Sequence, residues 1–139
     1  MDNKKKEQPS DFDWVTARAQ CSALTMFELL KADVQKNVET MKAIVAARGQ
    51  ESSYRFHASG ELLSVTRFWY GEEIGVKVSL YGEQFEVGSK GVGADGFSAT
   101  LTLDDSGECR FLVDGERLDR WQFLRRAFEP LFFPTERGK

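Results

Sequence analysis

The chain has 139 residues, a hydrophobic fraction of 41% and a formal net charge of −3. This length favours one domain with a hydrophobic core of its own. The small negative charge gives no general attraction to nucleic acid, and no stretch approaches the roughly 20 apolar residues of a membrane span. We therefore predict a single domain over residues 11–139, preceded by a disordered tail over residues 1–10, with no nucleic-acid partner and no membrane span.

The two cysteines, Cys21 and Cys109, lie far apart in the sequence and match no metal-binding or redox spacing. Each falls on an apolar position of its expected element, which is typical of a buried free thiol. No apolar run follows the basic residues near the N-terminus, so no secretory signal is visible. We predict two buried thiols and a cytoplasmic protein.

The stretch from Asp13 to Arg48 contains no glycine or proline and predicts one long helix. A straight helix of this span would be roughly 54 Å long, whereas a domain of this size has a radius of gyration of about 14 Å. We expect the helix to bend, to split near Thr25 or Ala32, or to project with an apolar end that needs a partner. Its apolar stripe recurs every three or four residues and comprises Trp14, Ala17, Cys21, Leu24, Phe27, Leu30, Val34, Val38, Met41 and Val45.

After residue 53 the period of the apolar residues changes from 3.6 to 2, and short turns containing glycine follow. This pattern predicts an antiparallel meander of five or six strands with one buried face and one exposed face. The strands are expected at 53–58, 62–70, 74–81, around 85–87, 97–103 and 108–113. The fold class is therefore α+β, with the inner face of the sheet packed on the long helix.

A last helix is expected over residues 116–128, with Asp114 as its N-cap and Pro130 at its end. It should pack on the sheet, and the apolar residues 131–134 should fold back onto the body. The residues expected to share one face are Leu118, Trp121, Leu124 and Phe128, and Phe123 lies away from that face, which suggests a contact on a second side of the helix.

Three features resemble parts of catalytic or cofactor-binding sites, but none of them predicts catalysis or cofactor binding here. Gly91–Gly96 matches the G-x-G-x-x-G pattern of dinucleotide-binding loops, but a strand is expected after it where those loops need a helix N-terminus. His57, the only histidine, is expected on the exposed face of its strand, away from any cleft. The carboxylate pairs Glu72–Glu73 and Asp104–Asp105 lie in expected turns. We expect no cofactor and no metal, and we lean against an enzyme.

Two sets of side chains are candidates for a binding surface. An aromatic set on the second and third strands is either an exposed recognition patch or a core shared by two layers, and it comprises Phe68, Trp69, Tyr70 and Tyr81. A basic set on the last helix is either an anion contact or paired with acidic residues of the sheet, and it comprises Arg117, Arg120, Arg125 and Arg126. Residues 51–115 carry 5 basic and 11 acidic side chains, a balance that opposes phosphate binding on the sheet.

Two functions from different classes fit these features. The first is a non-catalytic protein-interaction or adaptor module, which binds a protein partner or forms a homodimer through the long helix or the outer sheet face. The alternative is a carrier of a small apolar ligand, with a cavity between the sheet and the long helix. The residues expected to line that cavity include Val78, Phe85, Leu101 and Phe111.

Overall fold

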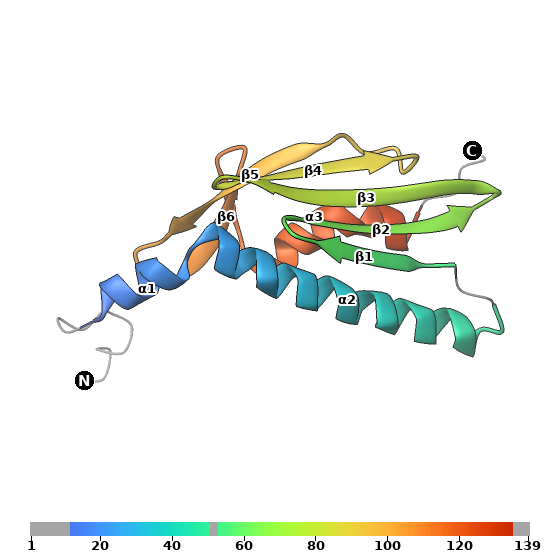
Figure 1. The fold of residues 1–139 in the computed structure, drawn as a ribbon, viewed down its shortest axis with the longest axis horizontal. Coiled ribbons are helices and arrows are strands. Elements are labelled where there is room, and N and C mark those ends of the chain that lie inside the picture. Colours follow the sequence, from blue (N-terminus) through green and yellow to red (C-terminus); the bar gives the residue numbers. More distant parts are fainter. Residues whose placement is uncertain (1–11, 51–52, 135–139) are drawn as a thin grey trace.

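The computed structural model describes residues 12–50 and 53–134. It contains a seven-stranded antiparallel sheet with two helices, α2 and α3, packed on one face (Figure 1). The elements are α1 (Trp14–Gln20), α2 (Ala23–Ala47), β1 (Arg55–Ser59), β2 (Leu62–Trp69), β3 (Glu72–Tyr81), β4 (Gln84–Lys90), β5 (Phe97–Leu103), β6 (Cys109–Val113), β7 (Glu116–Leu118) and α3 (Arg120–Phe132). The predicted α+β fold is confirmed, with more strands than expected. The tail predicted over residues 1–10 lies outside the described residues.

The long predicted helix is split, and the break lies at Cys21 and Ser22 rather than near Thr25 or Ala32. The side chain of Ser22 accepts a hydrogen bond from the backbone N–H of Thr25 at 3.2 Å. A serine that binds a free N–H group of the following turn is a strong helix start, so α2 begins anew at this position. The cap is local and needs no glycine or proline.

The second part of this stretch, α2, is covered by the sheet along its whole length (Figure 1). Its buried residues are Ala23, Met26, Phe27, Leu30, Val34, Val38, Met41 and Val45. Leu24, which was expected in the stripe, is exposed because Ala23 and Met26 occupy the buried face. The helix α1 buries no residue, and its Trp14 is 63% exposed. The uncovered portion of the stretch is therefore its N-terminal end.

Each strand pairs with the next one along the chain, in the order β1 to β7. The register places Val65 opposite Val76, and Val78 opposite Val87, on the face that α2 and α3 cover. Farther along the sheet, Phe111 stacks on Phe123 of α3 with 4.1 Å between ring centroids. The inner face of the sheet is thus packed against both helices, and the outer face is left uncovered by the described residues.

The C-terminal helix begins later than predicted, because Glu116–Leu118 forms the strand β7. Its N-cap is Asp119 rather than Asp114, and the side chain of Gln122 accepts from the N–H of Asp119 at 2.8 Å, as in a capping box. The predicted face is only partly correct, because Leu124 and Phe128 are buried whereas Trp121 is 59% exposed. The buried residues of α3 are Phe123, Leu124, Ala127, Phe128 and Leu131.

Pro130 does not end this helix, contrary to the prediction, but lies inside it. A proline removes one N–H donor, and this costs little so close to the end of a helix that is already packed on the body. The backbone N–H of Phe133 still donates to the carbonyl of Glu129 at 2.8 Å. The helix therefore extends to Phe132, and its last turn adds apolar side chains.

Cys21 and Cys109 form a disulfide, so the prediction of two free thiols is wrong. The bond joins the break between α1 and α2 to the start of β6, with the two Cα atoms 5.3 Å apart and a sequence separation of 88. Distant residues become neighbours here because β6 passes beside the start of α2. No described helix is long and apolar enough to cross a membrane.

A candidate binding groove between the two packed helices

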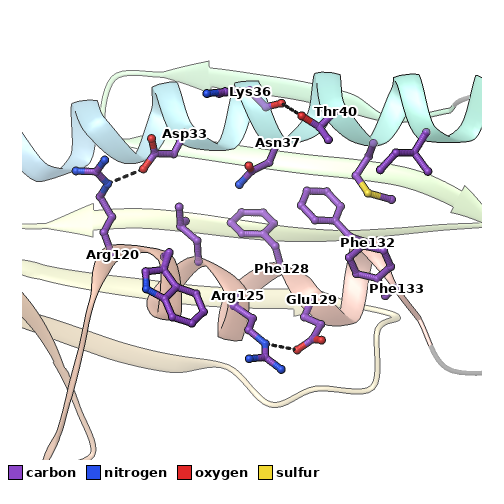
Figure 2. A pocket seen from close by; sticks show the side chains of 14 residues that line it. Asp33, Lys36, Asn37, Thr40, Arg120, Arg125, Phe128, Glu129, Phe132 and Phe133 are labelled. Carbon is purple, nitrogen blue, oxygen red and sulfur yellow. Dashed lines mark hydrogen bonds and ion pairs between the residues drawn. The ribbon is translucent and has the colours of Figure 1, made fainter.

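A groove with a volume of about 740 Å³ lies between α2 and α3 (Figure 2). Its apolar walls are formed by Met41 and Ile44 of α2 and by Leu124, Phe128 and Phe132 of α3. The three residues of α3 recur every fourth position and therefore share one side of the helix. Phe132 belongs to this side only because α3 continues through Pro130 to Phe132.

Two large aromatic residues at the ends of α3 also line the groove. Trp121 lies in its first turn and is 59% exposed, and Phe133 follows its last turn and is 61% exposed. Neither side chain is covered by another described part of the chain. Exposed aromatic residues beside an apolar groove are typical of a surface that binds another molecule.

The rim of the groove is polar and carries charges of both signs. At one end the Nε of Arg120 donates to Oδ2 of Asp33 at 2.6 Å, which joins the two helices (Figure 2). Along α3 the Nε of Arg125 donates to Oε1 of Glu129 at 3.1 Å. Lys36 of α2 also lines the groove and has no ion-pair partner among the described residues.

The groove has the length of a short helix. It extends over residues 33–44 of α2 and 120–133 of α3. At 1.5 Å per residue these segments are roughly 17–20 Å long. They run side by side in Figure 2, so the groove is an elongated channel rather than a round pocket.

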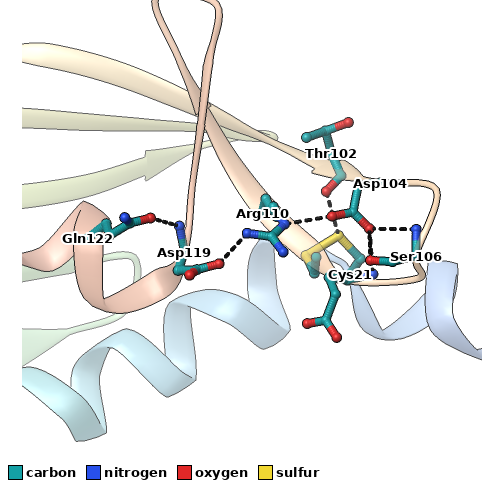
Figure 3. A network of polar contacts seen from close by, with 9 residues as sticks. Cys21, Thr102, Asp104, Ser106, Arg110, Asp119 and Gln122 are labelled. Carbon is teal, nitrogen blue, oxygen red and sulfur yellow. Dashed lines mark hydrogen bonds and ion pairs between the residues drawn. A yellow bond between two sulfur atoms is a disulfide. The ribbon is translucent and has the colours of Figure 1, made fainter. Parts of the chain in front are cut away.

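A polar network fixes the start of α3 against the sheet (Figure 3). Arg110 of β6 donates through Nε to Oδ2 of Asp104 at 2.6 Å and through its other nitrogen to the N-cap residue Asp119. The hydroxyl of Ser106 donates to Asp104 at 2.6 Å, and this bond, followed by the N–H of Glu108 and by Arg110, holds the pKa of the Asp104 carboxyl well below its usual range. The network lies beside the disulfide and anchors the first turn of α3.

The structure does not bring the predicted aromatic set together. Phe68 and Tyr70 are exposed near the β2–β3 turn, whereas Trp69 points to the inner face and is partly buried. Phe68 of β2 pairs with Glu73 at the start of β3. Tyr81 lies at the far end of β3, roughly 26 Å from Glu73 at the usual rise of a strand. Tyr81 therefore cannot share a contact patch with the other three residues.

Most of the predicted basic set is engaged in ion pairs. Besides the pairs of Arg120 and Arg125, Arg126 lies 3.4 Å from Asp114 and has its guanidinium 4.7 Å from the ring centroid of Phe97. Arg117 lies on β7 rather than on the helix and has no ion-pair partner among the described residues. Within the described ranges, three of the four are thus paired with carboxylates, and only Arg117 has no ion-pair partner.

The remaining candidates lie apart from one another. His57 is exposed, as predicted, and it lies on β1 opposite Ser64 of β2. The loop Gly91–Gly96 leads directly into β5, so no helix N-terminus follows the glycine pattern. Within the ranges 12–50 and 53–134, no three His, Cys, Asp or Glu side chains are grouped so as to hold a metal ion.

The fold and the groove define a two-layer α+β protein with an elongated apolar channel between its helices. Comparison of the chain with family models, with curated proteins and with solved structures finds no match. The groove was not expected from the sequence. The signal that could have found it is the spacing of Leu124, Phe128 and Phe132, which becomes visible only when the helix is extended through Pro130.

Proposed function

We propose that the protein is a non-catalytic interaction module that binds an amphipathic helix of a partner protein in the groove between α2 and α3. The observation that carries this proposal is an open apolar channel with Trp121 and Phe133 exposed at the ends of α3. Tryptophan is the residue type most enriched among those that dominate binding energy at protein interfaces.

A helix fits the groove better than an extended peptide does. The groove offers no free strand edge for backbone pairing, because helices form both of its walls. A helix of about 12 residues matches its length, and its apolar residues at positions i, i+4 and i+7 would contact the accessible lining residues Trp121, Ile44 and Phe133. Lys36 supplies a free cation at the rim, so we expect an acidic residue on the partner beside the apolar stripe.

The alternative function, a carrier of a small apolar ligand, has less support. The space between the sheet and α2 is filled by side chains, and Val78, Phe85 and Phe111 are fully buried there. Phe85 lies with its ring centroid 5.4 Å from that of Phe111 and 6.2 Å from that of Phe123. We therefore favour a macromolecular partner on the surface over a ligand in the interior.

The disulfide bears on the cellular compartment in which the protein would meet this partner. A cytoplasmic location stays a prediction, and the bond between Cys21 and Cys109 weighs against it, because cytosolic reductants keep most thiols reduced. An oxidising compartment is the better expectation for the folded protein and for its partner.

A selection from a phage-displayed library of amphipathic helical peptides tests the proposal. We expect the selected peptides to share apolar residues at helical spacing, to be helical when bound, and to protect the amides of α2 and α3 from hydrogen exchange. Peptides that protect the outer face of the sheet instead would contradict it. Sedimentation of the protein alone, over a range of concentrations, measures whether it forms a homodimer. A homodimer with a second copy of the chain in the groove would also contradict the proposal of a different partner protein.

A further inference from the structure

The outer face of the sheet, opposite the helices, carries a second candidate site. We propose that the strands β1 to β4 bind a small phosphate-bearing molecule there, through the side chains of Lys77 and Lys90. This site is independent of the groove, because it lies on the other face of the sheet. It runs against the expectation that the acidic middle of the chain opposes phosphate binding.

The strand register assembles the site from residues that are distant in sequence. Two neighbouring rows of cross-strand partners run over the four strands on the outer face. One row consists of His57, Ser64, Lys77 and Gly88. The other consists of Arg55, Thr66, Gly75 and Lys90. Neither row contains a carboxylate, and together they hold three permanent cations, one histidine and two hydroxyl groups.

The cations of these rows have no ion-pair partner in the part of the chain that the structure describes. Residues 51–115 contain five basic side chains, of which Arg67 packs inward and Arg110 forms ion pairs. The other three are Arg55, Lys77 and Lys90, and none has an ion-pair partner among the described residues. Most of the described acidic side chains of the same segment lie in turns and loops. The net charge of the segment therefore does not reveal the basic surface on its strands.

The face is hollowed where the two lysines lie. A depression of about 360 Å³ lies there, and the residues that line it include Ser64, Thr66, Gly75, Lys77, Gly88, Lys90 and one carboxylate, Glu73. The glycines leave its floor without side chains, and a Cβ atom at Gly75 would lie only 2.8 Å from Cγ2 of Thr66. Since Lys77 pairs with Gly88, Lys90 is its diagonal neighbour, at roughly 7–8 Å. Two flexible ammonium groups at this spacing can both reach one phosphate, while the hydroxyl groups of Ser64 and Thr66 donate to its oxygens.

The surroundings of the depression favour a small ligand over an extended polyanion. Glu73 lies beside the two rows on one side, where it pairs with Phe68. Glu86 lies beside them on the other side, where it pairs with Ser79. These carboxylates would repel a nucleic-acid backbone or an anionic bilayer that continued past the depression. The four strands cover only about 14 Å at the usual spacing, which matches a phosphomonoester or a diphosphate.

Titration of the protein with pyrophosphate at low ionic strength, followed by amide NMR, tests the proposal. We expect saturable shifts at Ser64, Thr66, Gly75 and Gly88, and an affinity at least about tenfold lower in the double variant Lys77→Gln/Lys90→Gln. The double variant Arg18→Gln/Arg117→Gln removes two cations that lie elsewhere and have no ion-pair partner among the described residues, and it should bind as the wild type does. The amide spectra of both variants report directly whether the fold is retained.

Two results would overturn this inference. One is the absence of saturable binding, or an equal loss of affinity in the two double variants, which would indicate a general effect of net charge. The other is tighter binding to vesicles of phosphatidylcholine with phosphatidylserine than to pyrophosphate, with the loss again confined to Lys77→Gln/Lys90→Gln. That outcome would assign the surface to a membrane.

Discussion

Arg120 at the start of α3 donates to the carboxylate of Asp33 in the middle of α2 at 2.6 Å, and this pair closes one end of the groove. Both side chains are partly exposed, so water screens the interaction. We expect Arg120→Ala and Asp33→Ala each to lower the free energy of unfolding by about 0.5–1 kcal/mol. A double-mutant cycle by urea denaturation measures the coupling. A coupling of zero would show that the pair does not hold the helices together.

The disulfide should contribute more to stability than any ion pair. It closes a loop of 88 residues, and removing a bond of this kind from a small domain typically costs about 2–5 kcal/mol. We expect Cys21→Ser/Cys109→Ser to lose this amount in urea denaturation, and dithiothreitol to destabilise the wild type but not the double variant. Free thiols in the wild type, detected by labelling after unfolding without reductant, would contradict the bond.

Two aromatic residues of α3 should differ sharply in their effect on stability. Phe123 is fully buried and stacks on Phe111, whereas Trp121, two residues away, is 59% exposed in the groove. Phe123→Ala should lower the free energy of unfolding by about 3–5 kcal/mol, because it leaves a cavity in the core. Trp121→Ala should lower it by less than about 1 kcal/mol. Similar losses in both variants would mean that Trp121 is part of the core rather than of a binding surface.

The network around Asp104 predicts a dependence of stability on pH. Hydrogen bonds hold the pKa of this carboxyl below its unfolded value of about 3.9, so its contribution is present above that pH and is lost as the pH falls below it. Wild-type protein should therefore lose more stability between pH 6 and pH 3 than Asp104→Asn does. Asp105→Asn, at the neighbouring exposed carboxyl, is the matched control. Parallel curves for wild type and Asp104→Asn would contradict this account.

Much of the fold could be predicted from local patterns. The alternation of apolar residues located the strands closely, and the stripe from Phe27 to Val45 on α2 is buried as expected. The break before α2 was misplaced because the cap by Ser22 is a single short side chain within a long helical pattern. The prediction that Pro130 ends the helix is wrong, because the effect of a proline depends on packing and on its distance from the helix end, and neither is visible in the sequence.

The features on which the proposals rest depend on contacts between distant residues, which local sequence patterns do not reveal. Cys21 and Cys109 become partners only when β6 lies beside the start of α2. Lys77 and Lys90 become neighbours only through the register of β3 with β4. The groove needs the extension of α3 through Pro130 to Phe132. Local periodicity predicts each element but not which side chains the elements bring together.

The central claim is that the groove between α2 and α3 binds a helix of a partner protein, with Trp121 as a main contact. The dissociation constant of the best selected helical peptide, measured for wild type, Trp121→Ala and Tyr81→Ala, tests it most directly. Tyr81 is a comparably exposed aromatic residue on the outer sheet face. We predict an increase of at least about tenfold for Trp121→Ala, as for a residue that dominates an interface, and less than about twofold for Tyr81→Ala. Unchanged affinity in Trp121→Ala would contradict the proposed function.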